Sequence, residues 1–201
     1  MKKKILKIIN LKNKRPLVCL TAYSKPFAKI LDNHCDIILV GDSLATAMLG
    51  LKDTHHVSLE TMIQHGISVK SNIIKSLCVV DMPANSYNNV KQAKKNAKLI
   101  FDRTKCDAVK IECNGKNYKI IKSIIDIGIP VMGHIGFTPQ YFKKFKIQGV
   151  LKKDQNRLLT QAIKNQEAGV FSLVLECINS SIAKKITKSL KIPTVGIGAS
   201  A

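Results

Sequence analysis

Ionisable residues follow several short apolar runs of this 201-residue sequence, and their types suggest metal-assisted acid–base chemistry. The residues concerned are Asp42, Asp81, Lys110, Glu112, His134 and Glu176, and the hydroxyl of Ser43 lies beside Asp42 in the chain. Three of the carboxylates, Asp42, Asp81 and Glu112, suit a hard divalent ion such as Mg²⁺, which prefers oxygen ligands and keeps waters that a substrate can displace. Glu176 is then free to act as a general base.

Lys110 and His134 add two groups that can handle a small oxyacid. Lys110 can pair with a substrate carboxylate or stabilise an enolate oxygen, and the alternation of a strand places it on the same side as Glu112. His134 can orient a substrate oxygen or exchange a proton. Each residue alone also has a structural interpretation, such as a helix cap or a salt bridge. Ionisable residues at the ends of five consecutive runs favour a shared site over a purely structural barrel.

The apolar runs themselves predict the elements that position these residues. Runs of strand length lie at 17–20, 37–40, 77–80, 108–111, 129–132, 171–175 and 192–197, and stretches with helical periodicity separate them. Ser58 is the expected N-cap of one such helix, and Pro130 and Pro193 are expected at the first residues of their strands. Alternating strands and helices with short connections predict a parallel sheet, which closes most naturally as a (β/α)8 TIM barrel. A doubly wound open sheet is the alternative, but no GxGxxG motif opens a helix.

The chain is expected to form a single barrel domain over residues 1–201. Residues 1–16 are expected to form a capping helix on that domain and the lead-in to the first strand. Barrels of this kind typically need about 250 residues. We therefore expect about seven of the eight strands, and a barrel that is incomplete at the C-terminus.

The composition of the sequence argues against a nucleic-acid-binding or membrane protein. The formal net charge is +20, but only three of the 33 basic residues are arginine and the lysines are spread along the chain, so nucleic-acid binding is not expected. No apolar run reaches the length of a membrane span, so no membrane partner is expected. The six cysteines form no CxxC pair, which favours a reducing, cytoplasmic compartment.

Short motifs along the whole chain resemble those of the ketopantoate hydroxymethyltransferase family, in the same order and at similar intervals. The two most specific are Val40-Gly41-Asp42-Ser43 and the stretch 133–140, Gly-His-Ile-Gly-Phe-Thr-Pro-Gln. The others are Thr21-Ala22-Tyr23, Asp81-Met82-Pro83, Val109-Lys110-Ile111-Glu112, Leu175-Glu176-Cys177 and Gly196-Ile197-Gly198-Ala199.

The resemblance implies a TIM barrel of the phosphoenolpyruvate/pyruvate-binding type and a step of pantothenate and coenzyme A biosynthesis. In that step a hydroxymethyl group passes from 5,10-methylenetetrahydrofolate to 3-methyl-2-oxobutanoate, giving 2-dehydropantoate through a Mg-stabilised enolate. It also implies a cytoplasmic homo-oligomer, a decamer in many family members.

The resemblance assigns roles to the residues named above. Asp42, Asp81 and Glu112 are expected to hold Mg²⁺. The residues expected to contact the ketoacid are Asp42, Ser43, Asp81 and Lys110, with His134 supporting its orientation. Glu176 is the expected proton acceptor, and His65 also matches the family pattern, with a structural role.

Two alternatives stay open at this point. A related Mg-dependent ketoacid lyase would use a similar set of acids, but the sequence has no Lys-Lys-Cys-Gly-type motif for its mobile loop. A truncated, inactive barrel that serves as an interaction protein would explain the short chain.

Overall fold

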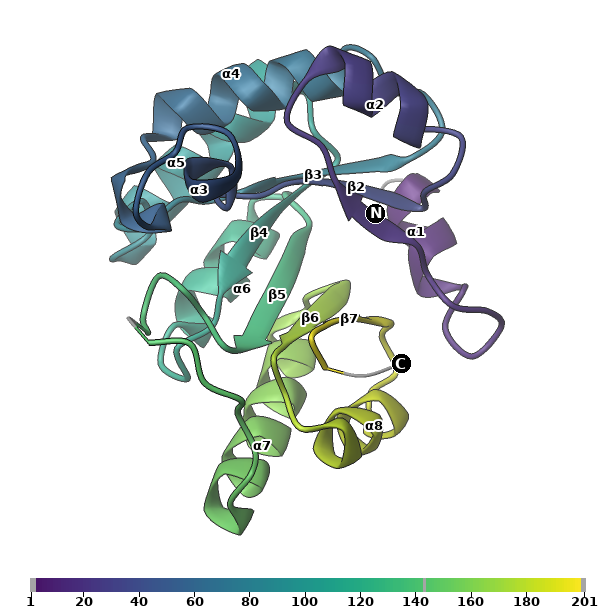
Figure 1. Ribbon diagram of the computed structural model, residues 1–201, viewed down its shortest axis with the longest axis vertical. Coiled ribbons are helices and arrows are strands. Elements are labelled where there is room, and N and C mark those ends of the chain that lie inside the picture. The colour runs from purple at the N-terminus through teal and green to yellow at the C-terminus, as the bar shows by residue number, and fades with distance from the viewer. Residues whose placement is uncertain (1–2, 143, 200–201) are drawn as a thin grey trace.

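The computed structural model describes residues 3–142 and 144–199, in which strands and helices alternate along the chain (Figure 1). Seven strands in this part of the chain form one sheet in the order β1-β2-β3-β4-β5-β6-β7. Their bounds are Cys19–Thr21 (β1), Ile37–Val40 (β2), Leu77–Asp81 (β3), Ala108–Glu112 (β4), Val131–Gly136 (β5), Ser172–Glu176 (β6) and Thr194–Ile197 (β7).

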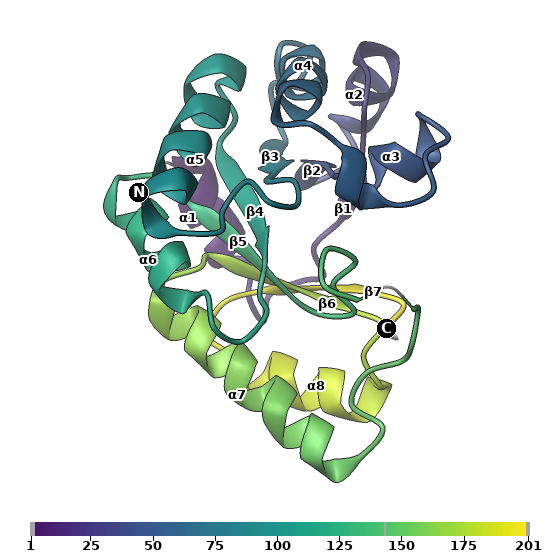
Figure 2. The same cartoon turned by 90° about the vertical axis from the view of Figure 1, so that its left-hand side faces the viewer.

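Every neighbouring pair of strands is parallel, and the sheet curls into a nearly closed barrel (Figures 1 and 2). The register aligns Asp81 with Lys110, and Glu112 with His134. It also aligns Gly136 with Glu176, so the predicted site residues lie at the same end of adjacent strands. The TIM-barrel prediction, with seven of its strands present in the described residues, is therefore confirmed.

Most of the helices connect the strands and cover the outside of the sheet (Figure 2). Their bounds are Lys3–Ile9 (α1), Lys25–Leu31 (α2), Leu44–Ala47 (α3), Leu59–Lys70 (α4), Val90–Thr104 (α5), Tyr118–Asp126 (α6), Lys152–Ala168 (α7) and Ser180–Ser189 (α8), with a 3-10 turn η1 at Thr54–His56. The main core lies between these helices and the sheet, and both faces of the central strands are buried. The expected N-cap Ser58 accepts a hydrogen bond from Thr61 N at 3.0 Å, which satisfies a free amide of α4.

A second, smaller core fills the interior of the barrel near the starts of the strands. Ile5 and Ile8 of α1 are buried there with Ile37 and Leu77, the first residues of β2 and β3. Because apolar side chains fill this end, the polar residues of the interior lie toward the carboxyl ends of the strands.

The two prolines do not begin strands, which corrects the prediction from sequence. Pro130 and Pro193 each precede the strand, and their carbonyl oxygens accept hydrogen bonds from Val109 N at 3.0 Å and Leu173 N at 3.1 Å. A proline can still accept through its carbonyl although it has no N–H to donate, so it fits one residue outside the strand. β5 runs from Val131 to Gly136, so His134 lies within this strand and not after it.

Across residues 3–142 and 144–199, no helix combines the length and the apolar character that a bilayer crossing needs.

Candidate active site

The carboxyl ends of β2 to β6 bring all the predicted site residues to one mouth of the barrel. Four of these side chains have almost no solvent exposure although they are ionisable: Asp81, Lys110, Glu112 and His134. Asp42 is also buried, Glu176 is partly open, and Ser43 is exposed. Burying so many ionisable groups costs folding free energy, and such clusters are typical of functional sites. This mouth is therefore the candidate site.

Asp81 and Lys110 form a buried ion pair. The Lys110 ammonium donates to Asp81 Oδ2, with both side chains almost fully enclosed. Burial raises the pKa of the Asp81 carboxyl to about 7, and Lys110 offsets part of that rise. Burial would lower the pKa of Lys110, but Asp81, Asp42 and Glu112 outweigh it and raise that pKa, so Lys110 carries its positive charge.

Asp42 and Glu112 are oriented by Gln140, which follows β5. The Gln140 side-chain amide donates to Asp42 Oδ2 at 2.7 Å, and its backbone N–H donates to Glu112 Oε2 at 3.0 Å. Burial raises the pKa of Glu112 well above its usual range, with Lys110 opposing and Asp42 and Asp81 adding to the rise. One glutamine therefore fixes two carboxylates that come from different strands.

His134 lies between two glutamates. Its Nε2 is 3.1 Å from Glu176 Oε2 and its Nδ1 is 3.6 Å from Glu112 Oε1, but neither contact has hydrogen-bond geometry. Burial, followed by the charge of Lys110, lowers the pKa of His134, which favours the neutral imidazole. The ring thus brings an unsatisfied nitrogen to each carboxylate.

Ser43 is held at the rim by an aromatic side chain. The hydroxyls of Tyr23 and Ser43 are 2.8 Å apart. His65, on α4, has its Nδ1 at 2.6 Å from the Tyr23 carbonyl oxygen. It therefore contacts the backbone of Tyr23 and not the candidate site residues themselves.

The carboxylates of the mouth have the character of an open Mg²⁺ site. Asp81 Oδ1 is buried without a hydrogen-bond partner, and three carboxylates face one ammonium, which leaves two negative charges uncompensated when all are ionised. In the present side-chain positions of the described residues, no three His, Cys, Asp or Glu groups enclose a metal ion. Mg²⁺ is commonly held by one or two carboxylates together with waters and substrate oxygens, so an open donor set fits it.

Two residues at the mouth carry functional contacts that the prediction from sequence did not assign. Gln140 stands in the Gly-Phe-Thr-Pro-Gln stretch, but its side chain was given no role. Tyr87, in the loop before α5, is buried and donates its hydroxyl to Gln140 Oε1. The position of Gln140 just after a strand end could have indicated a role at the mouth. Nothing in the sequence around Tyr87 indicates its contact with Gln140, which is distant in the chain.

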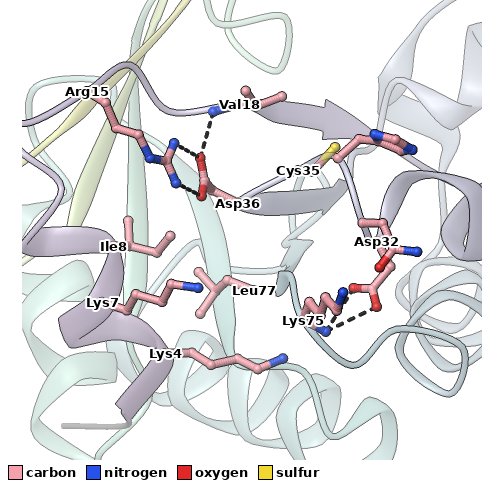
Figure 3. A pocket seen from close by; sticks show the side chains of 12 residues that line it. Lys4, Lys7, Ile8, Arg15, Val18, Asp32, Cys35, Asp36, Lys75 and Leu77 are labelled. Atoms are coloured by element: carbon pink, nitrogen blue, oxygen red, sulfur yellow. Dashed lines mark hydrogen bonds and ion pairs between the residues drawn. The ribbon is translucent and has the colours of Figure 1, made fainter.

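Another cavity lies at the opposite end of the barrel, where α1 faces the starts of β2 and β3 (Figure 3). Its acidic groups are fully engaged: Arg15 binds both oxygens of Asp36 at 2.8 and 2.6 Å, and Asp32 accepts from the backbone of Ile74, Lys75 and Ser76. These bonds hold the chain where the strands begin. Chemistry is therefore better placed at the other mouth, where buried charges are left unsatisfied.

Comparison with known proteins gives matches along almost the whole chain. The family model described as ketopantoate hydroxymethyltransferase matches residues 2–201. A 3-methyl-2-oxobutanoate hydroxymethyltransferase of Pelagibacter ubique (strain HTCC1062) is 50% identical over 200 residues, which cover 100% of this chain and 78% of that protein. The protein of the same name from Thermosipho africanus (strain TCF52B) is 47% identical, over 97% of this chain and 75% of its own length.

Solved structures show the same fold at low sequence identity. Phosphonopyruvate hydrolase, in a complex with oxalate and Mg²⁺, superposes with a TM-score of 0.73 at 13% identity, over 98% of this chain and 72% of the other. 2,3-Dimethylmalate lyase, described as a PEP mutase/isocitrate lyase superfamily member, gives a TM-score of 0.66 at 14% identity, over 94% and 70%. The family model and the curated relatives go further than the fold: the chain belongs to the ketopantoate hydroxymethyltransferase family and is an enzyme of the transferase class.

Proposed function

We propose that the chain transfers a hydroxymethyl group from 5,10-methylenetetrahydrofolate to 3-methyl-2-oxobutanoate, giving 2-dehydropantoate for pantothenate synthesis. The observation that carries this proposal is the convergence of buried Asp42, Asp81, Glu112 and Lys110 with the more open Glu176 at one mouth. A ketoacid needs both charge stabilisation and a base, and this mouth offers the two side by side.

Asp42, Asp81 and Glu112 are the residues that would hold Mg²⁺, which when bound acidifies the C3–H of the ketoacid as a Lewis acid. Lys110, held by Asp81, presents a fixed positive charge toward the oxyacid. The exposed Ser43 hydroxyl and the buried His134 ring are proposed to orient the ketoacid. Each of these groups is positioned before substrate arrives, which lowers the cost of ordering it.

Glu176 is the proposed proton acceptor. Its side chain is 23% exposed, whereas those of Glu112 and Asp81 are each 1% exposed, so Glu176 is the carboxylate that a substrate can reach. Water opens the methylene bridge of the folate: both carbon–nitrogen bonds break, the two protons of the water pass to the two nitrogens, and tetrahydrofolate leaves the one-carbon unit as formaldehyde. After Glu176 removes the C3 proton, C3 forms a bond to that carbon. The proton then passes from Glu176 to the formaldehyde oxygen, which becomes the hydroxyl of the product.

Cytoplasmic location and homo-oligomeric assembly, a decamer by resemblance, are proposed with this function. The six cysteines are all free, which fits a reducing compartment. Large apolar side chains such as Phe27 and Ile30 on α2 are more than half exposed, which fits burial against another subunit.

Turnover tests the proposal directly. The protein is mixed with both substrates and Mg²⁺, and the release of 2-dehydropantoate and tetrahydrofolate is followed by mass spectrometry, with an EDTA-treated sample as control. We expect equal amounts of the two products, and none after EDTA. Cleavage of the ketoacid without use of folate would instead favour the lyase alternative, and no reaction of either kind would favour an inactive barrel.

A further inference from the structure

The cavity at the starts of the strands, between α1 and β3, has more positive charge than its acidic residues compensate (Figure 3). It has a volume of about 260 Å³ and is lined by α1, the segment before β1, the loop between α2 and β2, and the start of β3. Its charged side chains are those of Lys4, Lys7, Arg15, Lys75, Asp32 and Asp36. Four positive charges therefore face two negative ones, which leaves a net charge of +2 when all six groups are ionised.

Both acidic side chains are already bound by other groups. Arg15 donates to both oxygens of Asp36, and Val18 N donates to its Oδ2 at 3.0 Å. Asp32 accepts from the backbone N–H groups of the three successive residues that precede β3. Across the described residues, neither carboxylate lies within ion-pair distance of a lysine of this cavity. The lysines therefore have no close counterion.

Two lysines of the cavity, Lys7 on α1 and Lys75 before β3, are available for a ligand. Both residues are exposed, and neither ammonium forms a hydrogen bond or an ion pair within the part of the chain that the structure describes. Figure 3 shows the Lys7 ammonium directed toward Leu77, a residue of the cavity lining. The two lysines come from segments far apart in the sequence, so the fold brings two positive charges to one hollow.

Lys4 adds a charge whose position is fixed. Its ammonium donates to the carbonyl oxygens of Ile74 and Ser76 at 2.6 and 2.7 Å. An ammonium has three N–H donors, so one donor is left over. Asn33 and His34 also line the cavity, and their side chains have no hydrogen-bond partner among the described residues. The lining thus combines positive charge with unused N–H donors, which is the complement of an anion.

The size of the cavity limits this anion to a small one. Pockets for drug-sized ligands measure about 300–1,000 Å³, so a volume of about 260 Å³ suits an ion or a small ester. A phosphate group carries about 1.5 to 2 negative charges near pH 7 and has three strong acceptor oxygens. Its charge therefore matches the net charge of the lining, and its oxygens match the unused donors.

We propose that this cavity binds a phosphate group, of free phosphate or of a small phosphomonoester, between Lys7 and Lys75 and with Lys4 as the third cation. The cavity lies at the end of the barrel opposite the candidate active site, so the inference goes beyond the proposed function and does not depend on it. A bound phosphate connects α1 with the start of β3, at the end of such barrels where residues serve stability. Because it binds the folded protein only, it raises the free energy of unfolding.

Titrations followed by ³¹P NMR test the proposal, in metal-free buffer with NaCl holding the ionic strength constant. Free phosphate and glycerol 3-phosphate are the two probes, and we expect both to bind the wild type. Each of Lys7→Met and Lys75→Met is expected to weaken binding about 2- to 5-fold, the effect of one exposed ion pair, and the double variant about 10-fold. The probe that binds more tightly identifies whether the cavity takes the free ion or the ester.

The matched control is the double variant Lys94→Met/Lys95→Met, because both lysines are exposed on α5 and the net charge falls by the same amount. It is expected to bind both probes like the wild type. Phosphate is expected to raise the melting temperature of the wild type and of this control by more than that of Lys7→Met/Lys75→Met. Melting without phosphate reports folding, and the single variants carry the test if the cavity double variant is unstable.

The inference is overturned if neither probe binds the wild type, or if the two folded double variants bind the probes equally well. Displacement of bound phosphate by 3-methyl-2-oxobutanoate would place the phosphate at the candidate active site and would also contradict the inference. No part of this test requires turnover. Failure of the proposed function, seen as absence of product from the ketoacid, therefore leaves the result for this cavity unchanged.

Discussion

Gln140 is the residue on which the arrangement of the mouth depends most. Its side-chain amide donates to Asp42 Oδ2 and to the Met82 carbonyl oxygen at 3.1 Å, and its oxygen accepts from Tyr87. Its backbone N–H holds Glu112. A residue with this role acts through the carboxylates that it orients, as the outer partners of metal ligands commonly do.

Replacing Gln140 by leucine is expected to weaken metal dependence and stability together. Asp42 and Tyr87 lose their partner in a buried place, which costs about 1–3 kcal/mol of unfolding free energy. The Mg²⁺ concentration for half-maximal turnover is expected to rise about 10- to 100-fold, as for other outer partners of metal ligands.

The matched control is Gln64→Leu, because Gln64 is on the surface of α4 and contacts only Glu60 among the hydrogen bonds of the described residues. Unchanged Mg²⁺ dependence in Gln140→Leu, measured alongside this control, would contradict the positioning role of Gln140.

At the scale of elements, Asp32 fixes the start of β3. It follows α2, is buried, and accepts from the backbone N–H groups of Ile74, Lys75 and Ser76 at 2.8 to 3.1 Å. Burial opposes the charge of Asp32, but the hydrogen bonds from Ser76, Ile74 and Lys75 together outweigh it and lower the pKa of the carboxyl.

The lowered pKa of Asp32 gives stability a defined pH dependence. Its contribution is complete above the unfolded-state pKa of about 3.9 and is lost as pH falls through the lower pKa of the folded state. Asp32→Asn is expected to reduce the free energy of unfolding by about 1–3 kcal/mol at pH 7. In urea titrations at decreasing pH, the gap between wild type and variant should narrow below pH 4. A gap that stays constant down to pH 2 would contradict this account.

Gly136 links the ends of β5 and β6. Its φ is +102°, and a Cβ there would lie 2.1 Å from the Glu176 carbonyl oxygen. Gly136→Ala is therefore expected to lower the free energy of unfolding by more than about 3 kcal/mol, because backbone must move. Gly128→Ala provides the comparison, since φ is +84° but nothing lies within 4 Å. Its expected cost is only about 1–2 kcal/mol, and equal costs in chemical denaturation would show that the close approach at Gly136 is not important.

The strands β2 to β5 were predictable because each begins with apolar residues, as parallel strands buried on both faces do, although Lys110 interrupts β4. The same runs predicted where the candidate site residues would lie, since Asp42, Asp81 and Glu112 stand where the runs end. Gln140 and Tyr87 could not be assigned, because their roles depend on contacts between loops that are far apart in the sequence. The short helix α3 and the turn η1 were also missed, as elements of four and three residues show no periodicity.

At the scale of the molecule, the described residues leave one edge unpaired on β1 and one on β7. Leu20 on β1 and Ile197 on β7 are 45% and 57% exposed. A hydrogen bond connects the segment before β1 with the helix before β7: Lys12 Nζ donates to the Thr187 carbonyl oxygen of α8 at 2.5 Å. Exposed apolar edges of this kind pair readily with other chains.

We therefore expect these edges to add open-ended association to the proposed homo-oligomer as the concentration rises. Ile197→Lys is expected to reduce this added association, because a charge on an edge opposes strand pairing. Sedimentation velocity over a concentration series measures the effect. Ile74→Lys is the control, since Ile74 is 84% exposed but lies outside the strands. Equal reduction by both variants would assign the effect to net charge instead of to the edge.

The most direct test of the proposed chemistry is exchange of the C3 proton of 3-methyl-2-oxobutanoate in D₂O, followed by NMR in the absence of folate. We expect Mg²⁺-dependent exchange by the wild type and by the control Glu167→Gln, because Glu167 is an exposed residue of α7. In Glu176→Gln the rate should fall about 10²- to 10⁴-fold, the usual contribution of a general base. Exchange by folded Glu176→Gln at the wild-type rate would contradict the proposed role of Glu176, and with it the assignment of the acid–base chemistry at this mouth of the barrel.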